Sequence, residues 1–127
     1  MTFEITPIFV AIFLIFGIAI AFPIGPLRGK VDINFWGGEP KLDRLVRGHG
    51  NFIEYVPFAL IGMATAELVG TPPSFLIGAG VILLVARVVH YFGLQVSGVG
   101  PARLIGTVAT MLITLSLACA ILWRFIA

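Results

Sequence analysis

Long apolar segments, separated by short stretches rich in polar residues, glycine and proline, make up most of this chain. The first apolar segment runs from Ile5 to Leu27 without a charged residue, which is long enough for a helix to cross a bilayer core. The last runs from Leu104 to Trp123, also without charge. Two more lie between them, so the pattern predicts a single domain, residues 1–127, with four membrane-spanning helices. Their expected ranges are about residues 3–27, 41–68, 74–96 and 101–125.

The predicted connections contain residues that stop helices. Pro23, Gly25 and Pro26 should end or kink the first helix, because proline lacks a backbone N–H donor. Residues 28–40 contain several polar side chains, paired glycines and a proline, which predicts a loop. Turns are also expected at residues 70–74 and 97–100, before the third and fourth helices.

Composition places the chain in the membrane. Of its 127 residues, 59% are hydrophobic and only 11% are charged, whereas soluble domains are about 25% charged. The net charge of +2, without a basic run, gives no argument for a nucleic-acid partner, and we expect none. A single cysteine rules out an internal disulfide framework, and we expect Cys119 to be a small packed residue because it lies in an apolar run.

The basic residues predict the orientation in the membrane. Six of the eight lie at or near the first and third connections: Arg28, Lys30, Lys41, Arg44, Arg47 and Arg103. Cytoplasmic loops carry the excess of lysine and arginine. Both termini should therefore face away from the cytoplasm, and the expected location is the inner or plasma membrane.

A polar stripe crosses the start of the second predicted helix. Arg44, Arg47, Asn51 and Glu54 follow one another at spacings of three, four and three, which places them on one helix face. Ionisable groups at membrane depth are costly and suggest a functional site. Two structural explanations remain open: snorkelling of the arginines to the headgroups, and a buried ion pair of Glu54 with Arg47 or Arg87.

The two histidines do not suggest a metal site. His49 lies about 200° around the helix from Arg47 and is therefore off the stripe. His90 follows Arg87 by three residues, and neither histidine has a second His, Cys or acid at a spacing suited to metal binding. We expect no metal, and each histidine is interpreted as a hydrogen-bonded packing residue.

Two segments resemble the MAPEG family, the membrane-associated proteins of eicosanoid and glutathione metabolism, which includes microsomal glutathione transferases. The first is Arg47-x-x-x-Asn51-x-x-Glu54-Tyr55-x-Pro57. The second combines Ala86-Arg87-Val88-Val89-His90 with Pro101-Ala102-Arg103. The length and the four predicted spans are similar to those of the family, and the chain resembles its bacterial members.

The resemblance implies a homotrimer of all-α, four-helix subunits, with glutathione as co-substrate in a cytoplasm-facing cleft between subunits. By motif position, the residues that contact glutathione are Arg47, Asn51, Glu54 and Tyr55, with Arg87 supporting the site. Arg103 matches the catalytic arginine that faces the glutathione sulfur. Arg28, at the end of the first helix, would reach the site from a neighbouring subunit.

The chemistry of these side chains agrees with that assignment. Glutathione has two carboxylates and one ammonium group, which complement several arginines and one glutamate. A free thiol with a pKa of about 8.5 is only a few per cent thiolate at pH 7. A neighbouring cation lowers a pKa by about 1–3, which would make the thiolate the major form beside Arg103. An apolar electrophile or a lipid hydroperoxide could then arrive from the bilayer, which predicts a glutathione transferase or peroxidase.

Two other functions are compatible with parts of the sequence. Leu94 and Thr107 occupy positions where the family often has tyrosines, which favours a non-catalytic lipid-binding or scaffold protein with the same fold. A small four-helix multidrug exporter has a similar length. It depends on a membrane-embedded acid in its first helix, and residues 5–27 contain none.

Overall fold

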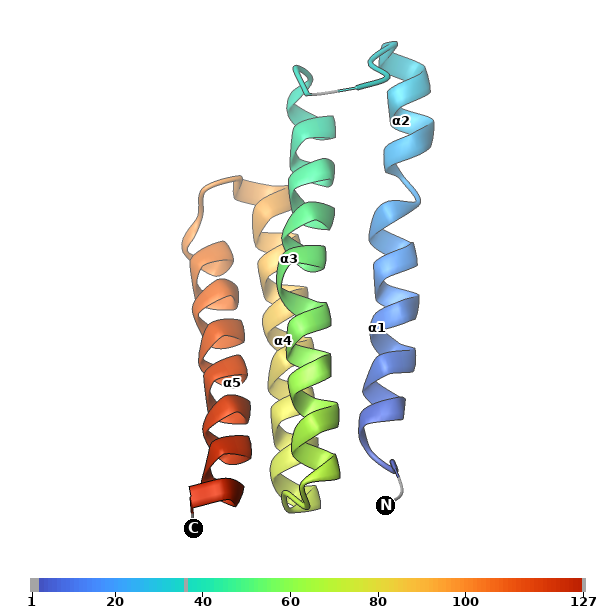
Figure 1. The fold of residues 1–127 in the computed structure, drawn as a ribbon. Helices are drawn as coiled ribbons and strands as arrows, with labels where there is room; N and C mark the ends of the chain where they lie inside the picture. The colour runs from blue at the N-terminus through green and yellow to red at the C-terminus, as the bar shows by residue number, and fades with distance from the viewer. Residues whose placement is uncertain (1–2, 36, 127) are drawn as a thin grey trace.

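The computed structural model describes residues 3–35 and 37–126, and all regular structure within them is helical. The helices are α1 (Thr6–Ala21), α2 (Ile24–Val31), α3 (Pro40–Leu68), α4 (Pro73–Ser97) and α5 (Pro101–Ile126). The last three agree with the predicted ranges to within one residue at each end. In Figure 1, α2 continues α1 as one column beside α3, α4 and α5.

The first predicted helix differs most from the structure. It is interrupted at Phe22 and Pro23, where Pro23 becomes the residue that precedes α2. α2 then continues to Val31 and ends at Asp32, which adopts the left-handed conformation with φ 54°. The prediction of a loop over residues 28–40 was therefore wrong in its first part, because Pro26 is tolerated in the first turn of a new helix.

The start of α3 is fixed by side-chain caps. Glu39 is the N-cap, and its carboxylate accepts the backbone N–H of Leu42 at 2.6 Å. Asp43 lies in the first turn and accepts the N–H of Gly38 at 3.0 Å. Pro40 occupies the first helical position, as its sequence context predicts. α3 continues through Pro57 to Leu68.

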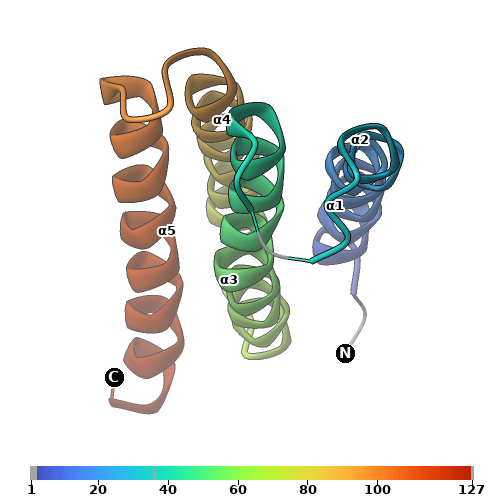
Figure 2. The same cartoon turned by 90° about the horizontal axis from the view of Figure 1, so that it is seen from above.

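The helices form an open bundle rather than a closed ring. α3 and α4 lie in the middle, α1 packs against them on one side and α5 on the other, and α1 does not contact α5 within the described residues. Both termini and the α3–α4 turn lie at one end, which we call the terminal end (Figure 1). The α2–α3 and α4–α5 connections lie at the opposite end, the loop end (Figure 1). Figure 2 shows the separation of α1 from α5 from above.

Apolar side chains fill the contacts between α1, α3, α4 and α5, with Phe13, Met63, Leu83 and Leu117 almost fully buried. The outward faces also bear large apolar side chains, as expected for a protein in a bilayer. Within residues 3–35 and 37–126, three helical segments are long and apolar enough to cross it: Thr6–Val31, Pro73–Ser97 and Pro101–Ile126. α3 falls outside this set because its polar stripe lowers its hydropathy.

Cys119 lies on the outward face of α5 and is exposed in the single chain, so the prediction that it packs was wrong. The buried residues of α5 are Gly106, Thr110 and Leu117, and Cys119 lies on the opposite side of the helix.

Glu67, at the end of α3, holds the start of α1. Its Oε1 accepts the backbone N–H groups of Glu4 and Ile5 at 2.7 and 2.8 Å, and its Oε2 accepts that of Thr6 at 2.8 Å. The carboxylate thereby satisfies N–H groups that a helix start leaves unpaired.

We expect Glu67→Gln to lower the free energy of unfolding by about 1 kcal/mol, because the amide keeps one acceptor oxygen and loses the charge. Thermal unfolding in detergent micelles measures the change. Lys30→Gln, an exposed substitution at the loop end, is the control. Equal melting temperatures for Glu67→Gln and wild type would show that the cap does not stabilise the bundle.

Candidate functional site

One buried arginine connects three helices. Arg87 on α4 is 2% exposed; its Nη1 donates to Oδ1 of Asn51 on α3 at 2.7 Å, and its Nη2 donates to the carbonyl of Gly106 on α5 at 2.9 Å. The ring of Tyr55 lies 5.7 Å from its guanidinium carbon, within the range of a cation–π contact. We call Arg87, Asn51 and the Gly106 carbonyl the Arg87 bridge. None of the described acidic side chains forms a salt bridge with Arg87.

The bridge depends on a glycine at the α4–α5 contact. A Cβ on Gly106 would lie 2.5 Å from the carbonyl oxygen of Ala86 and 2.6 Å from Cβ of His90. Only glycine permits this approach, which brings the Gly106 carbonyl within reach of Arg87. The same carbonyl also accepts the Thr110 hydroxyl at 2.8 Å.

Arg47 and Arg103 lie one helical turn from the bridge, toward the loop end. Arg47 precedes Asn51 by four residues on α3, and Arg103 precedes Gly106 by three on α5. α3 and α5 run in the same direction from the loop end (Figure 1), and they are in contact. The two predicted arginines therefore start from neighbouring helices at similar depth.

Arg47 pairs with Glu54 on its own helix. Arg47 Nη1 lies 3.0 Å from Glu54 Oε1, and the two side chains are 57% and 50% exposed. Of the two partners considered for Glu54, the structure selects Arg47 rather than Arg87. The pair is neither buried nor inter-helical, so it does not hold helices together.

The Arg103 backbone is held by two residues. Its carbonyl lies 3.0 Å from Nδ1 of His90 and accepts the Thr107 hydroxyl at 3.1 Å, and that hydroxyl lies 3.0 Å from Nδ1 of His90. His90 thus has the hydrogen-bonded packing role that its sequence suggested. The Arg103 side chain lines a hollow of about 300 Å³ together with Thr107 and the start of α5.

Arg28 and Arg47 line a second hollow, of about 450 Å³, between α2 and α3. Asp43 and Gly50 contribute to its walls. Arg103 lines a different hollow from these two arginines, so the single chain does not gather all the predicted site residues around one cavity. The structure brings Arg87, Asn51 and Tyr55 together, pairs Arg47 with Glu54, and brings Arg28 beside Arg47.

An apolar groove runs along α4 and α5 next to the bridge. Its volume is about 220 Å³, and it is lined by Val81, Ile82, Val85, Ala86, Val89, Ile105, Gly106 and Ala109. A groove of this composition suits an acyl chain or an apolar small molecule. Within the part of the chain that the structure describes, no group of three or more His, Cys, Asp or Glu residues is arranged to hold a metal ion.

Sequence reasoning missed three contributors to this region. Gly106 offers a backbone carbonyl, which leaves no side-chain signal. Thr107 supplies a hydroxyl to the Arg103 carbonyl, although the sequence marks it only as a replaced tyrosine. Gln95 donates from Nε2 to the carbonyl of Arg44 at 3.1 Å and so ties the end of α4 to α3.

Comparison with known proteins identifies the family. The MAPEG family model matches residues 30–123, which include the polar stripe, Arg87 and Arg103. Inner membrane protein YecN of Escherichia coli strain K12 is 37% identical over 57 residues, covering 45% of this chain and 44% of YecN. YecN of Escherichia coli O6:H1 strain CFT073 matches with the same identity and coverage. The aligned segment thus spans less than half of each relative. Because the family match covers most of the chain, the chain belongs to the MAPEG family and is a membrane protein of that family.

Proposed function

We propose that this protein is a membrane-bound glutathione transferase or peroxidase whose site lies at the loop end of the bundle. The observation that carries the proposal is the Arg87 bridge. By joining α3 to α5, it fixes Arg47 and Arg103 one turn beyond itself on two adjacent parallel helices. Two cations held in this way at the end of an apolar bundle favour a small anionic ligand.

The Arg47–Glu54 pair is arranged to exchange partners with a zwitterion. Both side chains are about half exposed, and exposed ion pairs are weak, so a ligand can replace either partner at low cost. A glutathione carboxylate would take the place of Glu54 at Arg47, while its ammonium group would bind Glu54. Arg28, which lines the same hollow as Arg47, would bind the second carboxylate.

Arg103 is proposed to face the sulfur. A guanidinium beside the thiol stabilises the thiolate, and the amino-terminal end of α5 adds a favourable dipole. The thiolate then donates an electron pair to the electrophilic carbon of the second substrate, and the leaving group departs with the pair from the broken bond. The apolar groove between α4 and α5, which includes Gly106, supports entry of that substrate from the bilayer.

A homotrimer would complete the site. The single chain leaves α1 and α5 apart, exposes their apolar faces, and separates the hollow of Arg103 from that of Arg28 and Arg47. A neighbouring subunit packed against these faces would close the cleft between the two hollows. We also propose that α3 is the fourth span. The basic loop end would then face the cytoplasm, and both termini would face away from it.

A non-catalytic lipid-binding or scaffold protein is the second candidate, and the positions of Leu94 and Thr107 favour it. Leu94 is 4% exposed and packs in the core. Its side chain has no hydroxyl group that could donate a hydrogen bond to a sulfur, as a tyrosine at this position could. The Thr107 hydroxyl is bound to the Arg103 carbonyl. If the apolar groove holds a lipid permanently, glutathione-dependent turnover is absent.

Thermal unfolding with glutathione tests the proposal. A ligand that binds only the folded state at 100 times its dissociation constant stabilises that state by about 2.7 kcal/mol, so millimolar glutathione should raise the melting temperature. Arg47→Gln should abolish most of the shift, whereas Arg124→Gln, at the terminal end, should preserve it. An unchanged melting temperature of the wild type across the millimolar range would overturn the glutathione assignment.

A further inference from the structure

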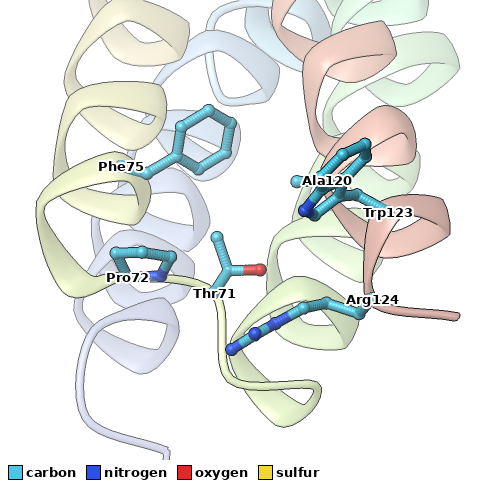
Figure 3. A pocket seen from close by; sticks show the side chains of 6 residues that line it. All are labelled: Thr71, Pro72, Phe75, Ala120, Trp123 and Arg124. Carbon is cyan, nitrogen blue, oxygen red and sulfur yellow. The ribbon is translucent and has the colours of Figure 1, made fainter. Parts of the chain in front are cut away.

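Another hollow, largely apolar but with two polar residues in its wall, lies at the terminal end, far from the proposed glutathione site. It has a volume of about 330 Å³ and lies between the start of α4 and the end of α5 (Figure 3). Its lining residues are Thr71, Pro72, Phe75, Ala120, Trp123 and Arg124. The proposed glutathione chemistry uses none of them, so a role for this hollow does not depend on that chemistry.

Thr71 lines this hollow, and its hydroxyl is buried beside it without a partner among the described residues. The residue is only 8% exposed, and its Oγ1 has no hydrogen-bond partner within the described part of the chain. Figure 3 shows the hydroxyl oxygen directed from the α3–α4 turn toward α5. Buried polar side-chain atoms are almost always hydrogen-bonded in folded proteins, so this hydroxyl points to a partner from outside the chain.

The other groups around the hollow favour a negatively charged partner. Arg124 brings a guanidinium group, which also donates to the carbonyl of Gly70. Trp123 can donate from its indole N–H. α4 starts after Pro72 without a side-chain cap, so its amino-terminal dipole remains available to an anion. The lining contains no aspartate or glutamate.

The position of the hollow selects the kind of anion. It lies where the apolar segments Pro73–Ser97 and Pro101–Ile126 begin and end, the level at which lipid headgroups meet the hydrocarbon core. Phe75 and Ala120 give it an apolar wall directed along the bundle. A phosphate bound by Arg124 and Thr71 would therefore continue into an acyl chain that contacts this wall.

We propose that this hollow is a binding site for the phosphate group of a glycerophospholipid in the leaflet at the terminal end. Arg124 binds the phosphate oxygens as a charge-assisted donor, and the Thr71 hydroxyl donates to the same group. The opposing explanation is that Trp123 and Arg124 only anchor α5 at the interface. Anchoring alone requires no contribution from the Thr71 hydroxyl.

Fluorescence quenching distinguishes the two explanations. Trp36→Phe leaves Trp123 as the only tryptophan in the sequence. This protein, in a neutral detergent, is titrated with a short-chain phosphatidylglycerol that carries bromine on its acyl chain. We expect saturable quenching of Trp123. The apparent dissociation constant should rise about tenfold with Arg124→Gln and about fivefold with Thr71→Val.

Thr114→Val is the matched control, because the Thr114 hydroxyl donates to the Thr110 carbonyl within α5 and does not line the hollow. It should leave the dissociation constant unchanged, and circular dichroism checks that each variant is folded. A dissociation constant that stays at the wild-type value in either Arg124→Gln or Thr71→Val would overturn the site. If inorganic phosphate, added at the same concentration as the lipid, displaces the lipid from the site, the lipid assignment is overturned in favour of a site for free anions.

Discussion

Replacing Arg103 by alanine should lower glutathione-dependent conjugation of an apolar aromatic halide by about 10²- to 10³-fold. That is the usual loss when one group that stabilises a developing or reacting anion is removed. The bundle itself should be preserved, because the hydrogen bonds from Thr107 and His90 meet the Arg103 backbone carbonyl, which alanine retains. Steady-state rates in detergent or liposomes, at saturating glutathione, measure the loss.

Two control variants test whether the loss of rate is specific to the guanidinium of Arg103. Arg124→Ala removes a guanidinium at the terminal end and should leave the rate near that of the wild type. Arg103→Lys keeps a cation but not the planar guanidinium, so it should fall between the wild type and Arg103→Ala. A rate unchanged in Arg103→Ala would remove Arg103 from the chemistry. Absence of turnover in wild type that still binds glutathione would favour the non-catalytic alternative.

Replacing Arg87 by alanine should lower the free energy of unfolding by about 3 kcal/mol. The substitution removes hydrogen bonds from a charged donor and leaves Asn51 on α3 without this partner in the core. It also leaves a cavity where three helices meet. Chemical or thermal unfolding in micelles measures the change, with the exposed Lys41→Ala at the loop end as the control.

Arg87→Met distinguishes the contribution that the volume of the Arg87 side chain makes to stability from the contribution of its charge. Methionine fills much of the same space, and replacing a buried charge by an apolar side chain is often tolerated. We therefore expect Arg87→Met to be more stable than Arg87→Ala, yet to bind glutathione poorly because the Arg87 bridge is lost. Wild-type stability of Arg87→Ala would show that the bridge does not join α3 to α5.

The sequence predicted those parts of the molecule that depend on local spacing. Proline and glycine at the ends of the apolar segments were sufficient to place α3, α4 and α5. The three- and four-residue spacing placed Arg47 and Glu54 on one face, and the structure pairs them. Arg87 lies inside an otherwise apolar segment, and it proves to be the most buried charged residue of the described bundle.

Other features depend on contacts between segments distant in the sequence. The Gly106 carbonyl becomes an acceptor only because α4 approaches α5 closely. The Glu67 cap joins residues more than sixty positions apart and has no local pattern. Cys119 faces outward because α5 packs through the opposite face, which contains Gly106, Thr110 and Leu117. Pro23 indicated the break before α2, but nothing in the sequence indicated that α2 continues as a helix past Arg28 to Val31.

The absorbance of the thiolate tests most directly whether Arg103 keeps the glutathione sulfur deprotonated. Glutathione is titrated into the purified wild-type protein at pH 7, and the ultraviolet absorbance of the bound thiolate is recorded against a sample without protein. We predict about one thiolate per bound glutathione with the wild type and a loss of that signal with Arg103→Ala. Binding that leaves the sulfur protonated in both proteins would contradict this role of Arg103.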